Sequence, residues 1–194
     1  FKAYDIRGIV GKSLTPEVVT AVGRALGTLA REHAGEGKPA AIAIGRDGRL
    51  SGPELSQALA RGIQAAGADV VDVGMVTTPM GYFAAHSLGT GSAVVVTGSH
   101  NPPDYNGLKM VIGGTTLSGD AIQALKQRIE TDRLASGQGA YRQTNVRDAY
   151  LDRVTGDVKL ARKMKIVVDA GNGVAGSIAP ELYRRLGCEV IELF

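Results

Sequence analysis

The stretch Val94–Ile112, VVVTGSHNPPDYNGLKMVI, predicts a strand, a rigid loop and a second strand. Small and β-branched residues fill Ala93–Thr97, as is typical of a buried strand. The segment Gly98–Pro103 cannot continue that strand, because its two prolines fix φ and remove two backbone donors. We therefore expect Ser99 to lie at the end of a strand, on a stiff polar loop.

The surrounding chain predicts a layered α/β fold with a mixed sheet. The strand over 107–112 returns from 93–97 across a loop too short for a parallel crossover, so this pair should be antiparallel. Thr15-Pro16-Glu17 has the pattern of a helix start, and apolar residues recur at helical spacing to about Glu32. Residues 1–12 and 132–145 show no clear periodicity, and we expect them to be irregular.

A second unit begins at Lys165 and repeats the order of an earlier one. The segments after Ala40 and after Lys165 both read as strand, glycine-rich loop, helix and strand. We therefore divide the chain into a first domain over 1–145, a helix and linker over 146–164, and the start of a second, similar domain over 165–194. One βαβ unit leaves a sheet edge uncovered, so we expect a fragment of a longer protein.

Composition excludes several classes of function. The 194 residues are 44% hydrophobic and 21% charged, with a net charge of +3. Few aromatic residues and no long basic run argue against nucleic-acid binding. No apolar run approaches the roughly 20 residues that span a bilayer. The lone cysteine, Cys188, excludes an internal disulfide, and we expect a cytoplasmic protein.

Ser99 and Lys109 are the residues of the central stretch that indicate chemistry. Ser99 could simply cap a turn, and an acyl-transfer role lacks the Gly-x-Ser-x-Gly elbow. His100 is adjacent, and in extended chain it would point away from Ser99, which makes it a poor base for that serine. Cations and amide donors near Ser99 favour a phosphoryl carrier instead. Lys109, inside an apolar strand, either meets an anion or faces solvent from an edge strand.

Two glycine-rich loops leave alternatives open. Gly45–Ser51, with Arg46 and Arg49, either assists an anionic substrate or the Ser99 loop, or forms an arginine–aspartate turn lock through Asp47. Gly171–Gly176 matches Gly-x-Gly-x-x-Gly between a strand and a helix, as in dinucleotide-binding folds. A tight structural turn is the favoured interpretation, because Asp169 would place a carboxylate beside a pyrophosphate.

Three motifs in order resemble those of one enzyme family. TGSHNP followed by DYNGLK over 97–109 resembles the phosphoserine loop of the α-D-phosphohexomutases. AYDIRG at 3–8 and GRDGRLS at 45–51 are similar to two further motifs of that family. Within it, the motifs are most similar to those of the bacterial phosphomannomutase/phosphoglucomutase subfamily. The resemblance implies a three-layer, phosphoglucomutase-like domain followed by further domains of similar plan.

The resemblance also implies an activity and a set of site residues. Members interconvert 1-phospho and 6-phospho hexoses through a phosphoserine and a hexose 1,6-bisphosphate, an intramolecular phosphotransfer that uses Mg²⁺. Phosphoglucosamine mutase activity and an inactive phosphosugar-binding form are the alternatives, and we expect this chain alone to be inactive. Mg²⁺ would bind a phosphate oxygen on Ser99 together with aspartates beyond this chain, and the remaining domains would be partners. The implied catalytic residues are Ser99, Lys109, Arg7 and His100, and the implied substrate-binding residues are Tyr4, Arg7, Ser99 and Asn101.

Overall fold

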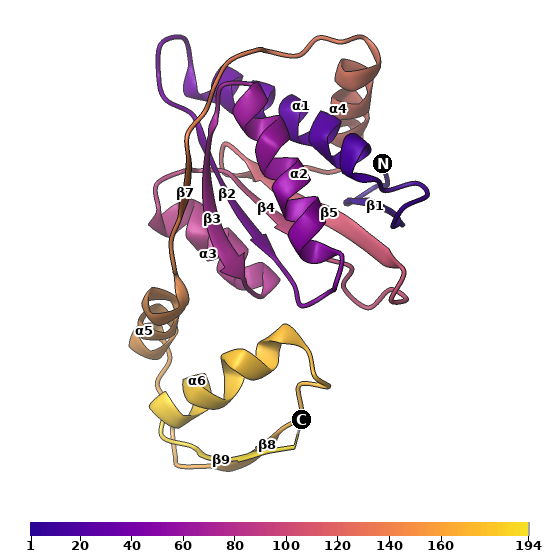
Figure 1. Cartoon of the computed structure of the whole chain (residues 1–194). Helices are drawn as coiled ribbons and strands as arrows, with labels where there is room; N and C mark the ends of the chain where they lie inside the picture. The colour runs from indigo at the N-terminus through magenta and orange to yellow at the C-terminus, as the bar shows by residue number, and fades with distance from the viewer. Residues whose placement is uncertain (194) are drawn as a thin grey trace.

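The computed structural model describes residues 1–193 and contains two sheets (Figure 1). The larger sheet has seven strands in the order β1-β5-β4-β2-β3-β7, with β6 paired to β5. Its strands are β1 (Ile6–Ile9), β2 (Ala41–Arg46), β3 (Asp69–Met75), β4 (Ala93–Val96), β5 (Tyr105–Ile112), β6 (Thr115–Thr116) and β7 (Tyr141–Gln143). The helices of this part are α1 (Pro16–Ala34), α2 (Gly52–Ala65), α3 (Thr78–Ser87), α4 (Asp120–Glu130) and α5 (Arg147–Asp157).

The second unit is smaller and lies beyond one end of the large sheet (Figure 1). Its parallel strands β8 (Lys165–Val168) and β9 (Glu189–Glu192) are connected through the 3₁₀ turn η1 (Val174–Ser177) and α6 (Ala179–Arg185). The predicted order of strand, loop, helix and strand is therefore confirmed.

The large sheet is mixed, as the sequence predicts. β2 is parallel to both β3 and β4, whereas β5 is antiparallel to β4 and to β1. Val95 lies opposite Lys109, and Val96 lies opposite Leu108. The connection between β4 and β5 is the loop that carries Ser99, so this loop projects from the carboxyl end of β4.

Helices α1, α2 and α4 cover one face of the sheet. Thr15 caps α1 by accepting a hydrogen bond from the Val18 amide at 3.3 Å, and Pro16 occupies the first turn. α1 and α2 pack closely because Gly23 and Gly62 lack side chains: a Cβ on Gly62 would lie 2.1 Å from the Thr20 carbonyl oxygen. The fully buried residues of this layer include Ile42, Ile44, Val94, Val96, Met110, Val22, Leu26, Leu59 and Ile63.

Helix α3 covers the opposite face and completes the three layers. A Cβ on Gly81 would come within 2.2 Å of the Val95 side chain, so α3 lies very close to β4. A second apolar cluster joins α3 to α5 and reaches Ile178 and Leu182 of the second unit. Because this cluster spans both units, apolar packing as well as the chain connects them.

Two edge strands were not predicted from the sequence. Residues 1–12 were expected to be a loop, but β1 pairs with β5, and Ile6 faces the buried core opposite Leu108. Residues 132–145 were expected to be irregular, but β7 extends the sheet beside β3 with all three residues exposed. A short edge strand needs no apolar alternation, so its partner strand decides its structure. Over residues 1–193, no helix combines the length and apolar character needed to cross a membrane.

Candidate functional site

Ser99 is exposed three residues after the end of β4 and has an uncommon backbone conformation. Its φ is +52°, a left-handed value that non-glycine residues rarely adopt. The Ser99 amide donates to Thr97 Oγ1 at 3.0 Å, which fixes the entry into the loop. A strained residue of this kind persists only where its surroundings hold it. The hydroxyl is thus presented to solvent by a specifically held backbone.

Arg49 and Asp47 hold this loop from the neighbouring β2–α2 loop. The Arg49 guanidinium donates to the carbonyl oxygens of Ser99 (3.1 Å), Asn101 (2.6 Å), Pro102 (2.6 Å) and Tyr105 (2.9 Å). Asp47 accepts from the amides of Arg49 and Gly98, both at 3.0 Å. Of the alternatives for Gly45–Ser51, the turn lock and assistance to the Ser99 loop therefore both occur.

His100 lies closer to Ser99 than extended geometry predicts. Its Nδ1 is 3.4 Å from Ser99 Oγ, whereas we expected the two side chains to diverge. The expectation was wrong because the positive φ of Ser99 turns the chain, so the alternation of an extended strand does not apply. At 3.4 Å the contact is longer than a normal hydrogen bond, so direct proton exchange between the two groups would require a closer approach or a bridging water.

Strand register places Arg7 and Lys109 on the α3 side of the sheet. Arg7 lies opposite Gly107, whose carbonyl accepts from the Thr97 amide at 2.9 Å. Because Gly107 has no side chain, nothing from β5 stands between Arg7 and Thr97 on that face. Lys109 is two residues further along β5, about 7 Å from Gly107, and its side chain points to the same face of the sheet as that of Arg7.

The two cations have different surroundings. Arg7 forms an ion pair with the buried Asp5 at 2.5 Å. Lys109 is half-buried, and none of the hydrogen bonds and ion pairs of residues 1–193 involves its ammonium group. A half-buried ammonium group without a protein partner suits an anionic ligand better than it suits a purely structural role.

Tyr4 and Asn101 differ in how firmly the structure holds them. Tyr4 is 80% exposed, just before β1. The Asn101 side chain donates to the Gly98 carbonyl at 2.8 Å and so closes the turn of the Ser99 loop. Its amide nitrogen is therefore already engaged within the loop.

A cavity of about 750 Å³ opens beside Ser99 and is lined by both units. Arg49, Leu50 and Ser99 contribute from the first unit, and Asn172 and Gly173 contribute from the second. Sequence reasoning treated 171–176 only as a structural turn or a nucleotide site, and it did not place this turn near Ser99. Only the internal repeat could have suggested this proximity, since repeated units can align their equivalent loops.

The residues of this chain do not by themselves fit a magnesium site. Mg²⁺ requires near-octahedral oxygen coordination, commonly with one or two carboxylates. Within residues 1–193, no group of three or more His, Cys, Asp or Glu side chains could hold a metal ion. Asp47, the carboxylate that contacts the Ser99 loop, is already engaged by backbone amides and Arg49. Ser99 could offer one oxygen to a site that other residues complete.

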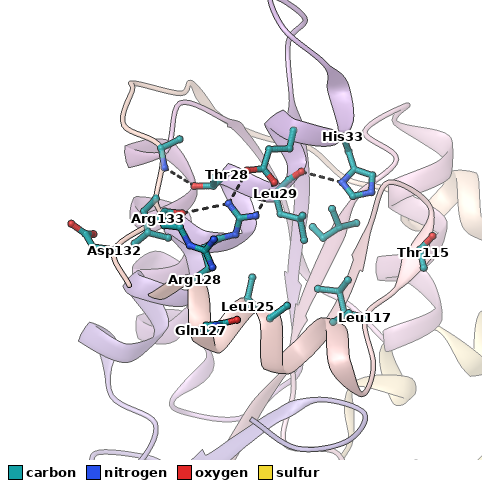
Figure 2. A pocket seen from close by; sticks show the side chains of 16 residues that line it. Thr28, Leu29, His33, Thr115, Leu117, Leu125, Gln127, Arg128, Asp132 and Arg133 are labelled. Atoms are coloured by element: carbon teal, nitrogen blue, oxygen red, sulfur yellow. Dashed lines mark hydrogen bonds and ion pairs between the residues drawn. The ribbon is translucent and has the colours of Figure 1, made fainter. Parts of the chain in front are cut away.

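A larger groove of about 880 Å³ lies between α1 and α4 and contains none of the predicted site residues (Figure 2). Its floor is apolar, with Leu117 and Leu125 among the lining residues. The guanidinium of Arg128 is paired with both carboxylate oxygens of Glu32, at 2.7 and 2.9 Å. The Arg128 charge is therefore already neutralised, whereas Arg133, which also lines the groove, donates to the Thr131 hydroxyl at 3.1 Å.

Comparison with known proteins gives consistent similarities. Residues 1–136 match the family described as "Phosphoglucomutase/phosphomannomutase, alpha/beta/alpha domain I". The chain is 52% identical over 194 residues to the phosphomannomutase/phosphoglucomutase of Pseudomonas aeruginosa, covering 100% of this chain and 41% of that protein. It is 54% identical over 196 residues to the phosphoglucomutase of Neisseria gonorrhoeae, covering 100% and 42%.

A solved structure agrees with these sequence similarities. The crystal structure of a phosphoglucomutase/phosphomannomutase family protein from Burkholderia thailandensis matches with a TM-score of 0.92 and 55% identity. The match covers 100% of this chain and 43% of that one. The chain thus spans about two fifths of the length of the curated relatives named above.

Proposed function

Because this chain belongs to the phosphoglucomutase/phosphomannomutase family, we propose that the full-length protein interconverts 1-phospho and 6-phospho hexoses through a phosphoserine at Ser99. The observation that carries the proposal is the presentation of Ser99: an exposed hydroxyl, held in a left-handed conformation, at the edge of a cavity of substrate size. The cations Arg7 on β1 and Lys109 on β5, both on the α3 side of the sheet, favour this role over that of a serine in a structural turn.

In the proposed reaction, phosphorylated Ser99 donates its phosphoryl group to the free hydroxyl of the bound sugar phosphate. The bond between phosphorus and Ser99 Oγ breaks, a bond to the sugar oxygen forms, and the hydroxyl proton leaves. The resulting hexose 1,6-bisphosphate reorients within the site and returns its other phosphoryl group to Ser99. Such transfers depend mainly on positioning and on neutralisation of charge.

Each side chain has a distinct part in this proposal. Arg7 supplies positive charge on the α3 side of β1, and Lys109 on β5 supplies it once it has accepted the sugar hydroxyl proton. His100, with Nδ1 3.4 Å from Ser99 Oγ, exchanges a proton with the serine oxygen. Tyr4 and Asn101 contact the sugar phosphate. Mg²⁺, the bisphosphate as activator and the remaining domains belong to the proposal for the full-length protein.

A panel of sugar phosphates would identify the preferred hexose. The relatives' names include both phosphomannomutase/phosphoglucomutase and phosphoglucomutase, so the proposal covers mannose and glucose phosphates. Comparing kcat/KM for mannose, glucose and glucosamine 1-phosphates ranks these against the glucosamine alternative.

Intact-mass analysis of the full-length protein tests the phosphoserine. Wild type treated with hexose 1,6-bisphosphate should carry one phosphate, and Ser99→Ala should carry none and lose turnover. Ser118→Ala, on an exposed turn before α4, is the matched control and should keep both. Normal turnover by Ser99→Ala, without phosphate on another residue, would contradict the proposal.

A further inference from the structure

The terminal nitrogens of Arg49 have no hydrogen left for a ligand. A guanidinium has five N–H donors, of which four are on the two terminal nitrogens. One terminal nitrogen contacts the Pro102 and Tyr105 carbonyls, and the other contacts the Ser99 and Asn101 carbonyls. The remaining Nε faces Asp47 at 3.7 Å. Arg49 therefore lines the Ser99 cavity with all four terminal N–H donors given to the loop, and its Nε–H lies on the side of the Asp47 carboxylate.

The loop residue Gly98 packs directly against this guanidinium. A Cβ built on Gly98 would lie 2.0 Å from Arg49 Nε and 2.2 Å from Cζ. The backbone angle of Gly98 is not in the left-handed region, so its lack of a side chain is required by contact with Arg49 rather than by conformation. Gly98 and Arg49 thus form a matched pair, one on each loop.

These contacts also orient the amides of the loop. Arg49 holds the carbonyl groups, the Ser99 and Asn101 amides have acceptors in Thr97 and Gly98, and Pro102 and Pro103 have no N–H. Among the backbone amides of residues 99–103, only that of His100 has no hydrogen-bond acceptor within residues 1–193. That amide follows Ser99 directly, where a phosphoryl oxygen on the serine would need a donor.

We propose that Arg49 is a positioning residue of the phosphoryl-transfer centre. It holds the four carbonyls so that Ser99 keeps its left-handed conformation and the His100 amide stays available to the phosphoryl group. This inference rests on the proposed function for its effect on turnover. The hydrogen-bonding role of Arg49 itself is testable without any activity.

The test uses the full-length protein with three variants: Arg49→Ala, Gly98→Ala and the double variant. Arg49→Ala should lower kcat by about 10²-fold, the scale expected when a reacting group is misplaced by about 1 Å, and leave KM within a few-fold. Gly98→Ala should have a similar effect, because its methyl group displaces the guanidinium. The double variant should be no worse than Arg49→Ala alone, because the methyl group added at position 98 fits once the guanidinium is gone.

Added guanidinium ion gives a readout that a general loss of structure would not produce. Millimolar guanidinium chloride should raise the kcat of Arg49→Ala at least tenfold, whereas sodium chloride at equal ionic strength should not. Arg31→Ala is the matched control, because Arg31 also donates to a carbonyl, that of Ala66 at 2.7 Å, at the opposite end of the sheet. Its kcat should stay within twofold of wild type.

Hydrogen exchange separates failure of this inference from failure of the proposed function. Peptides spanning 97–107 should lose amide protection in Arg49→Ala and keep it in Arg31→Ala, whether or not the wild type is a mutase. Unchanged protection and kcat in Arg49→Ala would overturn the inference, as would a raised KM with normal kcat or additive losses in the double variant. If Arg49→Ala does not fold, the Arg49→Lys variant provides the test. The single nitrogen of lysine cannot reach four carbonyls, so a normal kcat in Arg49→Lys would overturn the inference.

Discussion

Lys109 is a charged residue in an otherwise apolar part of its strand. Its neighbours Leu108 and Met110 are fully buried against α1 and α2, while Lys109 faces α3 from a half-buried position. A lysine in such a position loses part of its hydration and gains no ion pair within the described residues. The group that would best satisfy it is an anion delivered to the Ser99 end of the sheet.

Replacing Lys109 by methionine should separate catalysis from stability. Met fills a similar volume and removes the cost of a partly buried charge, so the thermal midpoint should not fall. If Lys109 carries charge and a proton in the transition state, kcat and kcat/KM should drop together by about 10²–10⁴-fold, or roughly 3–5 kcal/mol. Both quantities should be measured on the same purified full-length variant.

The matched control for that variant is Lys126→Met. Lys126 is an exposed lysine on α4 that pairs with Glu130 at 3.5 Å, and its loss should leave kcat unchanged. A Lys109→Met enzyme with kcat within a few-fold of wild type and an unchanged midpoint would refute the catalytic role.

At the scale of elements, the helices and strands that nearby residues determine were predicted from the sequence, and those that distant residues determine were not. The antiparallel β4–β5 pair, the Thr15 cap of α1 and the strand–loop–helix–strand order after Lys165 all depend on nearby residues, and the structure confirms them. Strand β1 depends instead on a partner about a hundred residues away, and the segment Ile6–Ile9 has no strand pattern of its own. Non-local pairing of this kind leaves little trace in a short polar segment.

The sequence indicated candidate residues for the site but not their geometry. The motifs identified Ser99, Lys109 and the Gly45–Ser51 loop, but not the fourfold contact from Arg49 to the Ser99 loop. Carbonyl acceptors are backbone groups that every residue carries, so the sequence contains no signal for them. The approach of His100 to Ser99 was missed for a related reason, since a positive φ at a serine is not encoded by residue type.

The Gly171–Gly176 turn gives a testable prediction at this scale. All three of its glycine amides have acceptors: Gly171 donates to Asp169 at 2.8 Å, Gly173 to the Ala170 carbonyl at 2.8 Å, and Gly176 to the Gly173 carbonyl at 3.0 Å. The Asp169 carboxylate also places negative charge where a pyrophosphate would bind. Fluorescence titration with NADH should therefore show no saturable binding at millimolar concentration. A micromolar Kd that is lost in a Gly173→Val variant would contradict this expectation.

At the scale of the whole molecule, α5 connects the two units through both apolar and charged contacts. Phe83 on α3 packs edge-on against Tyr150 on α5 with ring centroids 5.5 Å apart, and Leu151 is fully buried. On the other side of α5, Asp152 pairs with Arg185 of α6 at 2.8 Å. We propose that residues 165–194 begin a second domain, and that α5 fixes its position so that Asn172 and Gly173 face Ser99.

The charged part of this connection predicts a dependence on acid. Glu181 of α6 accepts hydrogen bonds from Arg147 and Arg185, and these hydrogen bonds hold the pKa of its carboxyl below the usual value for glutamate. A carboxyl with a lowered folded-state pKa stabilises the fold fully above its unfolded pKa, about 4.3. That contribution is lost as the pH falls through the lower folded-state value. The connection between α5 and α6 should therefore weaken in acid.

The measurement is the thermal midpoint of wild type minus that of Glu181→Gln, followed from pH 6 down to pH 3. Taking the difference cancels the titration of every carboxyl that the two proteins share. It should be positive and constant above about pH 5, where Glu181 is charged in both folded and unfolded states, and should shrink in more acid solution. Glu130→Gln is the matched control, because Glu130 has one exposed partner, Lys126, and its difference should stay near zero throughout. A difference for Glu181→Gln that is flat or grows as the pH falls would show that the arginine contacts do not stabilise this junction.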